Sequence, residues 1–145
     1  MIAKFPVVIK ASFQVPISSF FLLICRQSLL EAHLKKPDAK AILQSYDYQT
    51  DTHLENLLFC LSNRFSSRGF PHEIGLFLGY PPKDVGTFIE KKGKDYLCCH
   101  YWKVYHDKQS AIETFQLIDN SKLHAVRLLS QKIPVHTVAK MLTAI

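Results

Sequence analysis

The spacing of apolar residues is most regular between residues 52 and 65, where it predicts an amphipathic helix. Leucine and phenylalanine recur there every three or four positions, so their side chains share one side of a helix. Thr52 and Glu55 stand three residues apart at its start, as in a capping box. The predicted buried stripe consists of Leu54, Leu57, Leu58, Leu61 and Phe65.

Prolines and glycines mark the ends of the other predicted helices. Pro37 and Pro82 suit the first position of a helix, and Gly79 and Gly93 suit the position after the last turn. Apolar residues keep a near-helical period between these marks and again toward the C-terminus. The predicted helices span residues 28–36, 37–45, 52–65, 72–78, 83–92 and 107–133, with a break at 119–121, and a short helix follows Pro134.

Three apolar or aromatic runs predict strands, at residues 5–11, 18–25 and 96–105. The run at 18–25 lacks polar alternation, which is typical of a central strand buried on both faces. Neighbouring side chains of the run at 96–105 would point to opposite faces. The pattern predicts one α+β domain over residues 1–145: a small sheet of two to four strands, covered by several helices, which residues 96–105 join.

Charge and cysteine usage narrow the choice of partner and compartment. The formal net charge is +6, shared equally between residues 1–70 and 71–145, and this even spread argues against a nucleic-acid footprint. The longest early apolar run, residues 20–25, is too short to cross a membrane. Four cysteines without metal-ligand spacing fit a reduced protein, so we expect a cytoplasmic location and no membrane partner.

Residues 70–105 hold the candidate chemistry. His72-Glu73 resembles the start of a zinc-protease helix, but the second histidine of that motif would stand at Leu76, so we predict no metal site. The plainer interpretation of Glu73 is a carboxylate that suits a helix N-terminus. His72 stays open as a general base or ligand.

The second candidate is the segment Cys98-Cys99-His100-Tyr101-Trp102-Lys103. Adjacent thiols in a strand point to opposite faces, so they cannot grip one metal together. One thiol could react if Lys103 or His100 stabilised its thiolate. In the alternative, one cysteine belongs to the core and the other lines a surface or pocket. The aromatic side chains could form a stacking platform or ordinary sheet packing.

A family likeness rests on these same stretches. The run FPHEIGLFLGYP, followed by CCHYWKVY, resembles the signature of a bacterial family of unknown function, widespread in Firmicutes, whose strand motif reads CCGYWKVY. His100 replaces a glycine of that motif, so it is not a family-wide ligand. The resemblance implies a cytosolic bacterial protein and supplies no activity, substrate or cofactor.

The leading hypothesis is a non-enzymatic binding module for a small molecule or a protein partner. Its candidate site residues are His72, Glu73, Tyr80, Cys98, Cys99, Tyr101, Trp102 and Lys103. The first alternative is a thiol- or metal-dependent enzyme that uses Cys98 or Cys99 with His72 or His100. The second is a nucleic-acid-binding protein. The sequence identifies no cofactor.

Overall fold

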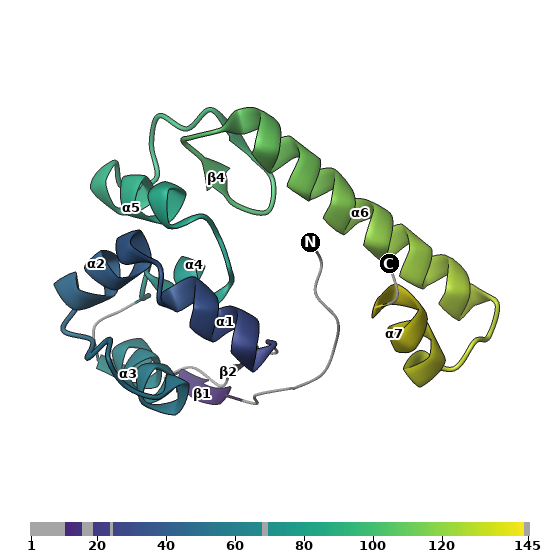
Figure 1. Cartoon of the computed structure of the whole chain (residues 1–145), viewed down its shortest axis with the longest axis horizontal. Coiled ribbons are helices and arrows are strands. Elements are labelled where there is room, and N and C mark those ends of the chain that lie inside the picture. The colour runs from purple at the N-terminus through teal and green to yellow at the C-terminus, as the bar shows by residue number, and fades with distance from the viewer. Residues whose placement is uncertain (1–10, 16–18, 24, 68–69, 144–145) are drawn as a thin grey trace. The chain divides into compact units, whose positions relative to one another are not determined.

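The computed structural model describes residues 11–15, 19–23, 25–67 and 70–143, and over these ranges the chain is mostly helical. This composition of seven helices and two small sheets confirms the predicted α+β class. The elements, labelled in Figure 1, are β1 (Ala11–Val15), β2 (Ser19–Leu23), α1 (Gln27–Leu34), α2 (Pro37–Ser45), α3 (Leu54–Ser67), α4 (Ile74–Phe77), α5 (Pro82–Glu90), β3 (Cys98–Cys99), β4 (Lys103–Val104), α6 (Lys108–Ser130) and α7 (Val135–Thr143).

These elements group into two compact units. One ends at Asp95 and holds β1 to α5, and the other begins at Tyr96 and holds β3 to α7. We call them the N-terminal unit and the C-terminal unit. The extent of a single domain over residues 1–145 stays a prediction.

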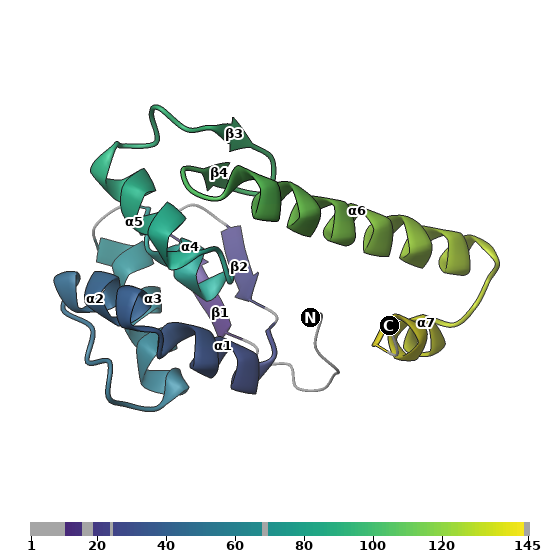
Figure 2. The same ribbon diagram turned by 45° about the horizontal axis from the view of Figure 1, so that its top comes forward.

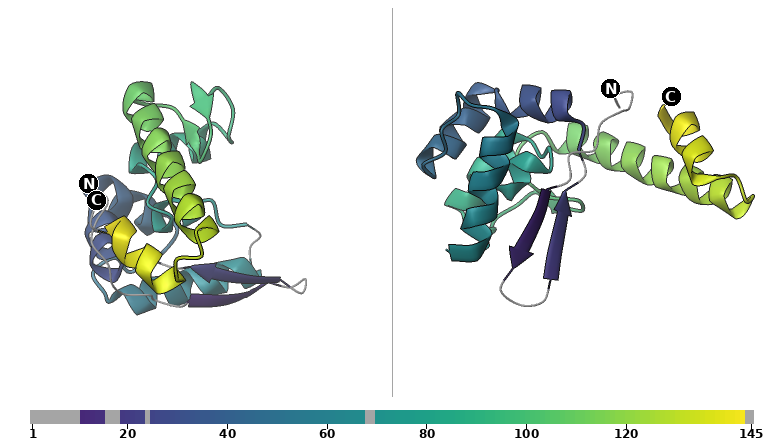
Figure 3. Two further views of the ribbon diagram at one scale, coloured as in Figure 1. Left: turned by 90° about the vertical axis from the view of Figure 1, so that its right-hand side faces the viewer. Right: turned by 90° about the horizontal axis from the view of Figure 1, so that it is seen from below.

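The N-terminal unit begins with an antiparallel hairpin of β1 and β2, in which Phe13 faces Phe21 (Figure 3). β1 begins at the residue where the first predicted strand ended, and residues 5–10 lie outside the described residues. Within the described part of the chain β2 pairs with β1 alone, so the prediction of a central strand is wrong. Leu23, the last residue of β2, packs against the main core of this unit.

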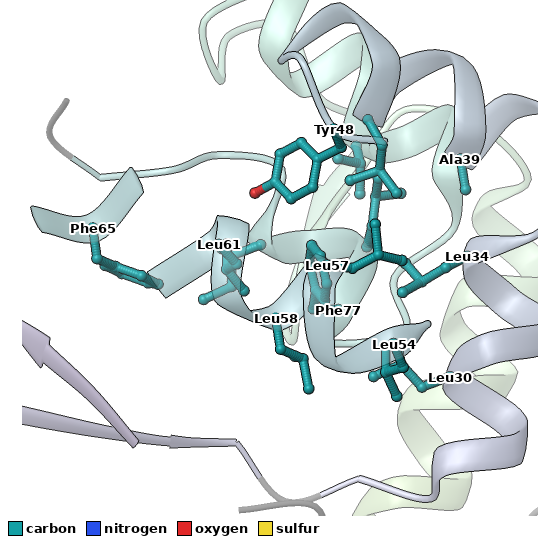
Figure 4. Close-up of a cluster of buried hydrophobic side chains, with 14 residues drawn as sticks. Leu30, Leu34, Ala39, Tyr48, Leu54, Leu57, Leu58, Leu61, Phe65 and Phe77 are labelled. Atoms are coloured by element: carbon teal, nitrogen blue, oxygen red, sulfur yellow. The ribbon is translucent and has the colours of Figure 1, made fainter. Parts of the chain in front are cut away.

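Helices α1 to α5 enclose the main core of this unit (Figure 4). The stripe predicted on α3 is confirmed, because each of its five side chains is buried. α1 and α2 contribute the facing leucines, and α4 contributes Phe77. The core consists of Leu30, Leu34, Ala39, Leu43, Tyr48, Leu54, Leu57, Leu58, Leu61, Phe65, Ile74, Leu76, Phe77 and Val85.

Two helical glycines of this unit differ in how closely a neighbouring helix approaches them. A Cβ atom built on Gly75 of α4 would lie 2.9 Å from Val85 Cγ2 and 3.2 Å from Tyr80 Cδ2. A Cβ atom on Gly86 of α5 would lie 3.4 Å from Ile42 Cδ1, the flexible end of its side chain. Gly75 thus fixes how tightly α4 packs on α5, and Gly86 does not.

The C-terminal unit begins with a tight hairpin, so the prediction of one strand over residues 96–105 is wrong. β3 pairs antiparallel with β4, with Cys99 opposite Lys103. The residues between them, 100–102, turn the chain and bring their rings onto Phe115 of α6. The rings of residues 100–102 contact Phe115 at the point where the chain reverses direction between β3 and β4. The two short strands form a sheet of their own, so this segment does not extend the N-terminal one.

Helix α6 runs unbroken over the segment 119–121, where a break was predicted. Asp107 caps its start, because the carboxylate accepts a hydrogen bond from the backbone N–H of Ser110 at 3.2 Å. The polar residues in its middle are engaged: Ser121 Oγ donates to the carbonyl of Leu117, and the carboxylate of Asp119 accepts a hydrogen bond from Tyr101. The helix continues through both residues, although a serine bond to the carbonyl four residues earlier slightly weakens helical backbone.

Figure 2 shows the β3–β4 hairpin beside the first turns of α6, and α7 folded back near the far end of that helix. A small core of Val104, Ala111 and Phe115 holds the hairpin to α6. α7 packs against α6, with Leu128 and Val138 buried. The C-terminal unit therefore buries few large apolar side chains for its size.

We predict that Gly75→Ala lowers the free energy of unfolding by about 1 kcal/mol or more, since overpacking outweighs the gain in helix propensity. Gly86→Ala is the matched control, because it also places alanine in a helix but meets only ordinary contact. We expect it to leave stability unchanged or to raise it by up to about 1 kcal/mol. Urea unfolding of both variants measures this, and equal stability of the two would contradict the close approach at Gly75.

Candidate functional site

Glu73, predicted as a candidate ligand, lies at the centre of a buried polar network in the N-terminal unit. Its side chain is fully buried just before α4. Its carboxylate accepts hydrogen bonds from Arg64 Nε of α3, from Arg64 Nη2 at 3.3 Å, and from the Tyr48 hydroxyl at 3.1 Å. The sequence reasoning missed both Arg64 and Tyr48, because neither stands at a fixed spacing from Glu73.

The network changes the acidity of the tyrosines around it. Burial, together with the negative charge of Glu73, raises the pKa of Tyr48 far above its ordinary value, so its hydroxyl keeps the proton that it donates to Glu73 in a hydrogen bond. Burial also raises the pKa of Tyr46, whose ring lies 4.4 Å below the Arg64 guanidinium. The charge of Glu73 is thus fully engaged by protein groups, and this arrangement is that of a structural ion pair.

The turn after α4 is anchored by a histidine from α1. Gly79 adopts a φ of 80°, which a residue with a side chain rarely adopts. His33 Nε2 lies 3.1 Å from the carbonyl oxygen of Tyr80, and because a carbonyl only accepts, Nε2 carries the proton. Burial, and then the charge of Lys36, lowers the pKa of His33, against the opposing effect of that hydrogen bond. His72, in contrast, is exposed and its ring contacts Phe88 with centroids 5.4 Å apart.

The thiols of the C-terminal unit occupy different environments. Cys98 is half-buried opposite Val104 and packs against the small core, while Cys99 is exposed opposite Lys103. The ammonium of Lys103 lies 4.8 Å from the ring centre of Tyr96, which is a cation–π contact. The two neighbouring residues of β3 thus occupy different environments, as the alternation of side chains along a strand predicts.

The turn between β3 and β4 is locked onto α6 by rings and charges. The His100 ring stacks on Tyr101 and Phe115, and Trp102 meets Phe115 edge-on with centroids 4.5 Å apart. The Tyr101 hydroxyl donates to Asp119 Oδ1 at 2.5 Å and accepts from Lys122 Nζ at 2.7 Å. Lys122 also lies over the Tyr101 ring, so this ring is covered by neighbours rather than presented as a stacking platform.

The predicted site residues therefore fall into two sets. His72, Glu73 and Tyr80 belong to the N-terminal unit, and Cys98, Cys99, Tyr101, Trp102 and Lys103 belong to the C-terminal unit. Within the second set the chain brings the aromatic residues together on α6. Among the residues that the model describes, no three His, Cys, Asp or Glu side chains are placed to hold a metal ion.

A surface that the sequence reasoning did not identify lies on α6 and α7. Val126 and Leu129, which keep the helical period toward the C-terminus, are 63% and 43% exposed. The large apolar side chains exposed on these two helices are Leu117, Leu123, Val126, Leu129, Val135 and Met141. A sequence signal did accompany them: no Asp or Glu follows Asp119, while Lys122, Arg127, Lys132 and Lys140 do.

A family model described as "Protein of unknown function (DUF3793)" matches residues 9–139 of the chain. The chain belongs to this family. The match confirms the resemblance to a family of unknown function. No curated protein and no solved structure matches the chain. None of the helices in the described ranges is both long and apolar enough to cross a membrane.

We predict that Glu73→Gln lowers the free energy of unfolding by about 3 kcal/mol, because it leaves the Arg64 charge without its partner in a largely buried setting. Asp51→Asn is the matched control, since it removes a carboxylate from the exposed Lys40–Asp51 pair. That exposed pair should contribute nothing measurable. Urea unfolding compares the two, and similar midpoints would show that the buried pair is not a major source of stability.

We predict that the titration of His33 makes the free energy of unfolding depend on pH. Its pKa in the folded chain lies below the value of 6.5 for the unfolded chain, so the unfolded chain takes up the proton first as pH falls. The contribution of His33 is therefore complete above about pH 6.5 and is lost as pH falls from there through the folded pKa. His33→Gln keeps an N–H donor for Tyr80 but cannot titrate, so it should flatten this part of the profile.

Urea midpoints at about pH 7.5 and about pH 5.5, for the unaltered chain and His33→Gln, measure this difference. We expect a smaller fall in the variant than in the unaltered chain. An equal fall in both would assign the pH dependence to other groups.

Proposed function

We propose that this chain is a non-enzymatic binding module and that its partner is a protein. The observation that supports this most is the exposed apolar surface on α6 and α7. Leu123, Val126 and Leu129 share one side of α6, and exposed apolar surface of this kind is typical of protein–protein contact. Cys25, Cys60, Cys98 and Cys99 form no disulfide in the described part of the chain, which suits a reducing compartment, so we propose a cytoplasmic location.

The hollows described in the N-terminal unit fit a small-molecule ligand poorly. One, between α1 and the start of α3, has a volume of about 80 Å³, which is far below that of a typical ligand pocket. The other has a volume of about 370 Å³ and is open. It is lined by Gln44 and by residues 47–51, of which Tyr48 is buried and the rest are polar. Ligand pockets are usually enclosed and mostly apolar. A protein partner is therefore the better supported form of the binding hypothesis.

The thiol enzyme has less support from the contacts of its residues. His100, one candidate base, stacks on Phe115 and lies 3.4 Å from Asp119 Oδ2. These contacts hold the His100 ring against α6. Cys99, the exposed thiol, lies opposite Lys103, whose ammonium is over the Tyr96 ring.

A photocrosslinking amino acid at position 126 tests the proposed function in the cell that produces the chain. We expect it to yield a discrete crosslinked protein, and we expect Leu129→Lys to abolish that product. The control places the crosslinker at Phe59 of α3, which is 67% exposed in the N-terminal unit. Failure to crosslink at position 126, or the same products from both positions, would contradict the proposal.

A further inference from the structure

Helix α6 carries apolar residues along one side, of which the hairpin covers only the first part. Asp119 and Lys122, which bond to Tyr101, lie on the same side between the two parts. At about 100° per residue, Ala111, Phe115, Leu123, Val126 and Leu129 fall within an arc of about 120°. Ala111 and Phe115 are buried under the hairpin, with Val104 as part of the same cluster. Figure 2 shows that the hairpin lies beside the first turns of α6 and no further.

The second part of that face stays open although α7 packs against the same helix. Leu128, on the opposite side of α6, is buried, whereas Leu123 and Val126 are 55% and 63% exposed. The three open residues, Leu123, Val126 and Leu129, stand three positions apart on two turns of helix. Such spacing is what a second amphipathic helix meets when it lies along a helix face.

The basic side chains near the open residues indicate the charge of the partner that would bind there. The described residues from 120 to 143 contain Lys122, Arg127, Lys132 and Lys140 and no carboxylate side chain. Arg127 follows Val126 along the edge of the open face, and Lys132 lies just past the end of α6. A second copy of this chain would bring like charges together, which costs free energy across an interface.

The composition of the segment also distinguishes a helix from a lipid surface. Residues 116–143 contain no Phe, Trp or Tyr. Helices that lie in a membrane interface usually carry such aromatic anchors. Aliphatic side chains at helical spacing instead suit ridge-and-groove packing with another helix.

We infer that Leu123, Val126 and Leu129 form a docking surface for an acidic amphipathic helix of a partner protein, whose carboxylates pair with Arg127 and Lys132. This inference rests on the proposed function and specifies its partner. The aliphatic contacts supply the buried area, and the cations at the edge set the charge of the partner and speed its encounter.

The test uses the full chain and a synthetic peptide of about 18 residues, long enough to hold a helix. Its leucines recur at helical spacing and glutamates flank them, and a matched peptide carries glutamine in place of every glutamate. Fluorescence anisotropy should show that the glutamate peptide binds about tenfold more tightly than the glutamine peptide. Raised salt should weaken only the glutamate peptide, because it screens the pairs at the edge.

Two variants locate the binding on α6. Val126→Ser combined with Leu129→Ser should weaken the glutamate peptide by about tenfold or more. Arg127→Gln combined with Lys132→Gln should remove the preference for glutamate over glutamine. Phe59→Ser and Lys83→Gln alter an exposed apolar residue and an exposed cation of the N-terminal unit, so they should change neither quantity.

Four outcomes would overturn the inference. They are no peptide binding tighter than about 1 mM, equal binding of both peptides, self-association that Val126→Ser abolishes, and binding to phosphatidylglycerol vesicles that Val126→Ser abolishes. In the third case the occupant would be a second copy of the chain, and in the fourth it would be a lipid surface. If position 126 crosslinks a cellular protein while the acidic peptide does not bind, the proposed function stands and this inference fails.

Discussion

The N-terminal unit depends on the ion pair between Arg64 and Glu73. A carboxylate with no exposed surface loses its hydration, which costs several kcal/mol of folding free energy unless hydrogen-bonding partners replace the water. Arg64 and Tyr48 supply those partners, so α3, the loop before it and the start of α4 must all meet at one carboxylate. The leucine core around this pair supplies most of the stabilisation, while the pair restricts how the three segments can be arranged.

The C-terminal unit has no comparable centre, and this difference bears on function. Its core is limited to Val104, Ala111 and Phe115 under the hairpin, with Leu128 and Val138 buried farther along. Six large apolar side chains of α6 and α7, among them Leu123, Val126 and Leu129, are exposed to water. The protein partner that we propose would cover this face.

Local patterns predicted the helices well and the long-range contacts poorly. The stripe of α3, the helix starts at Pro37 and Pro82 and the cap at Asp107 follow from spacing and backbone chemistry within a few residues. The hairpin at residues 96–105 could not be predicted, since aromatic residues favour strands and only Phe115 of a later helix makes the reversal favourable. The role of Glu73 was missed for the same reason: its partner Arg64 lies on another helix.

The central functional claim is that the face of Leu123, Val126 and Leu129 is open to water in the free chain. Methyl NMR with a soluble paramagnetic agent measures this for single side chains in the intact protein. We predict strong broadening of the Val126 methyl signals, while those of the buried Val104 and Val138 stay sharp. Val126 signals as well protected as those of Val104 would contradict the account, because they would show that this chain already covers the face itself.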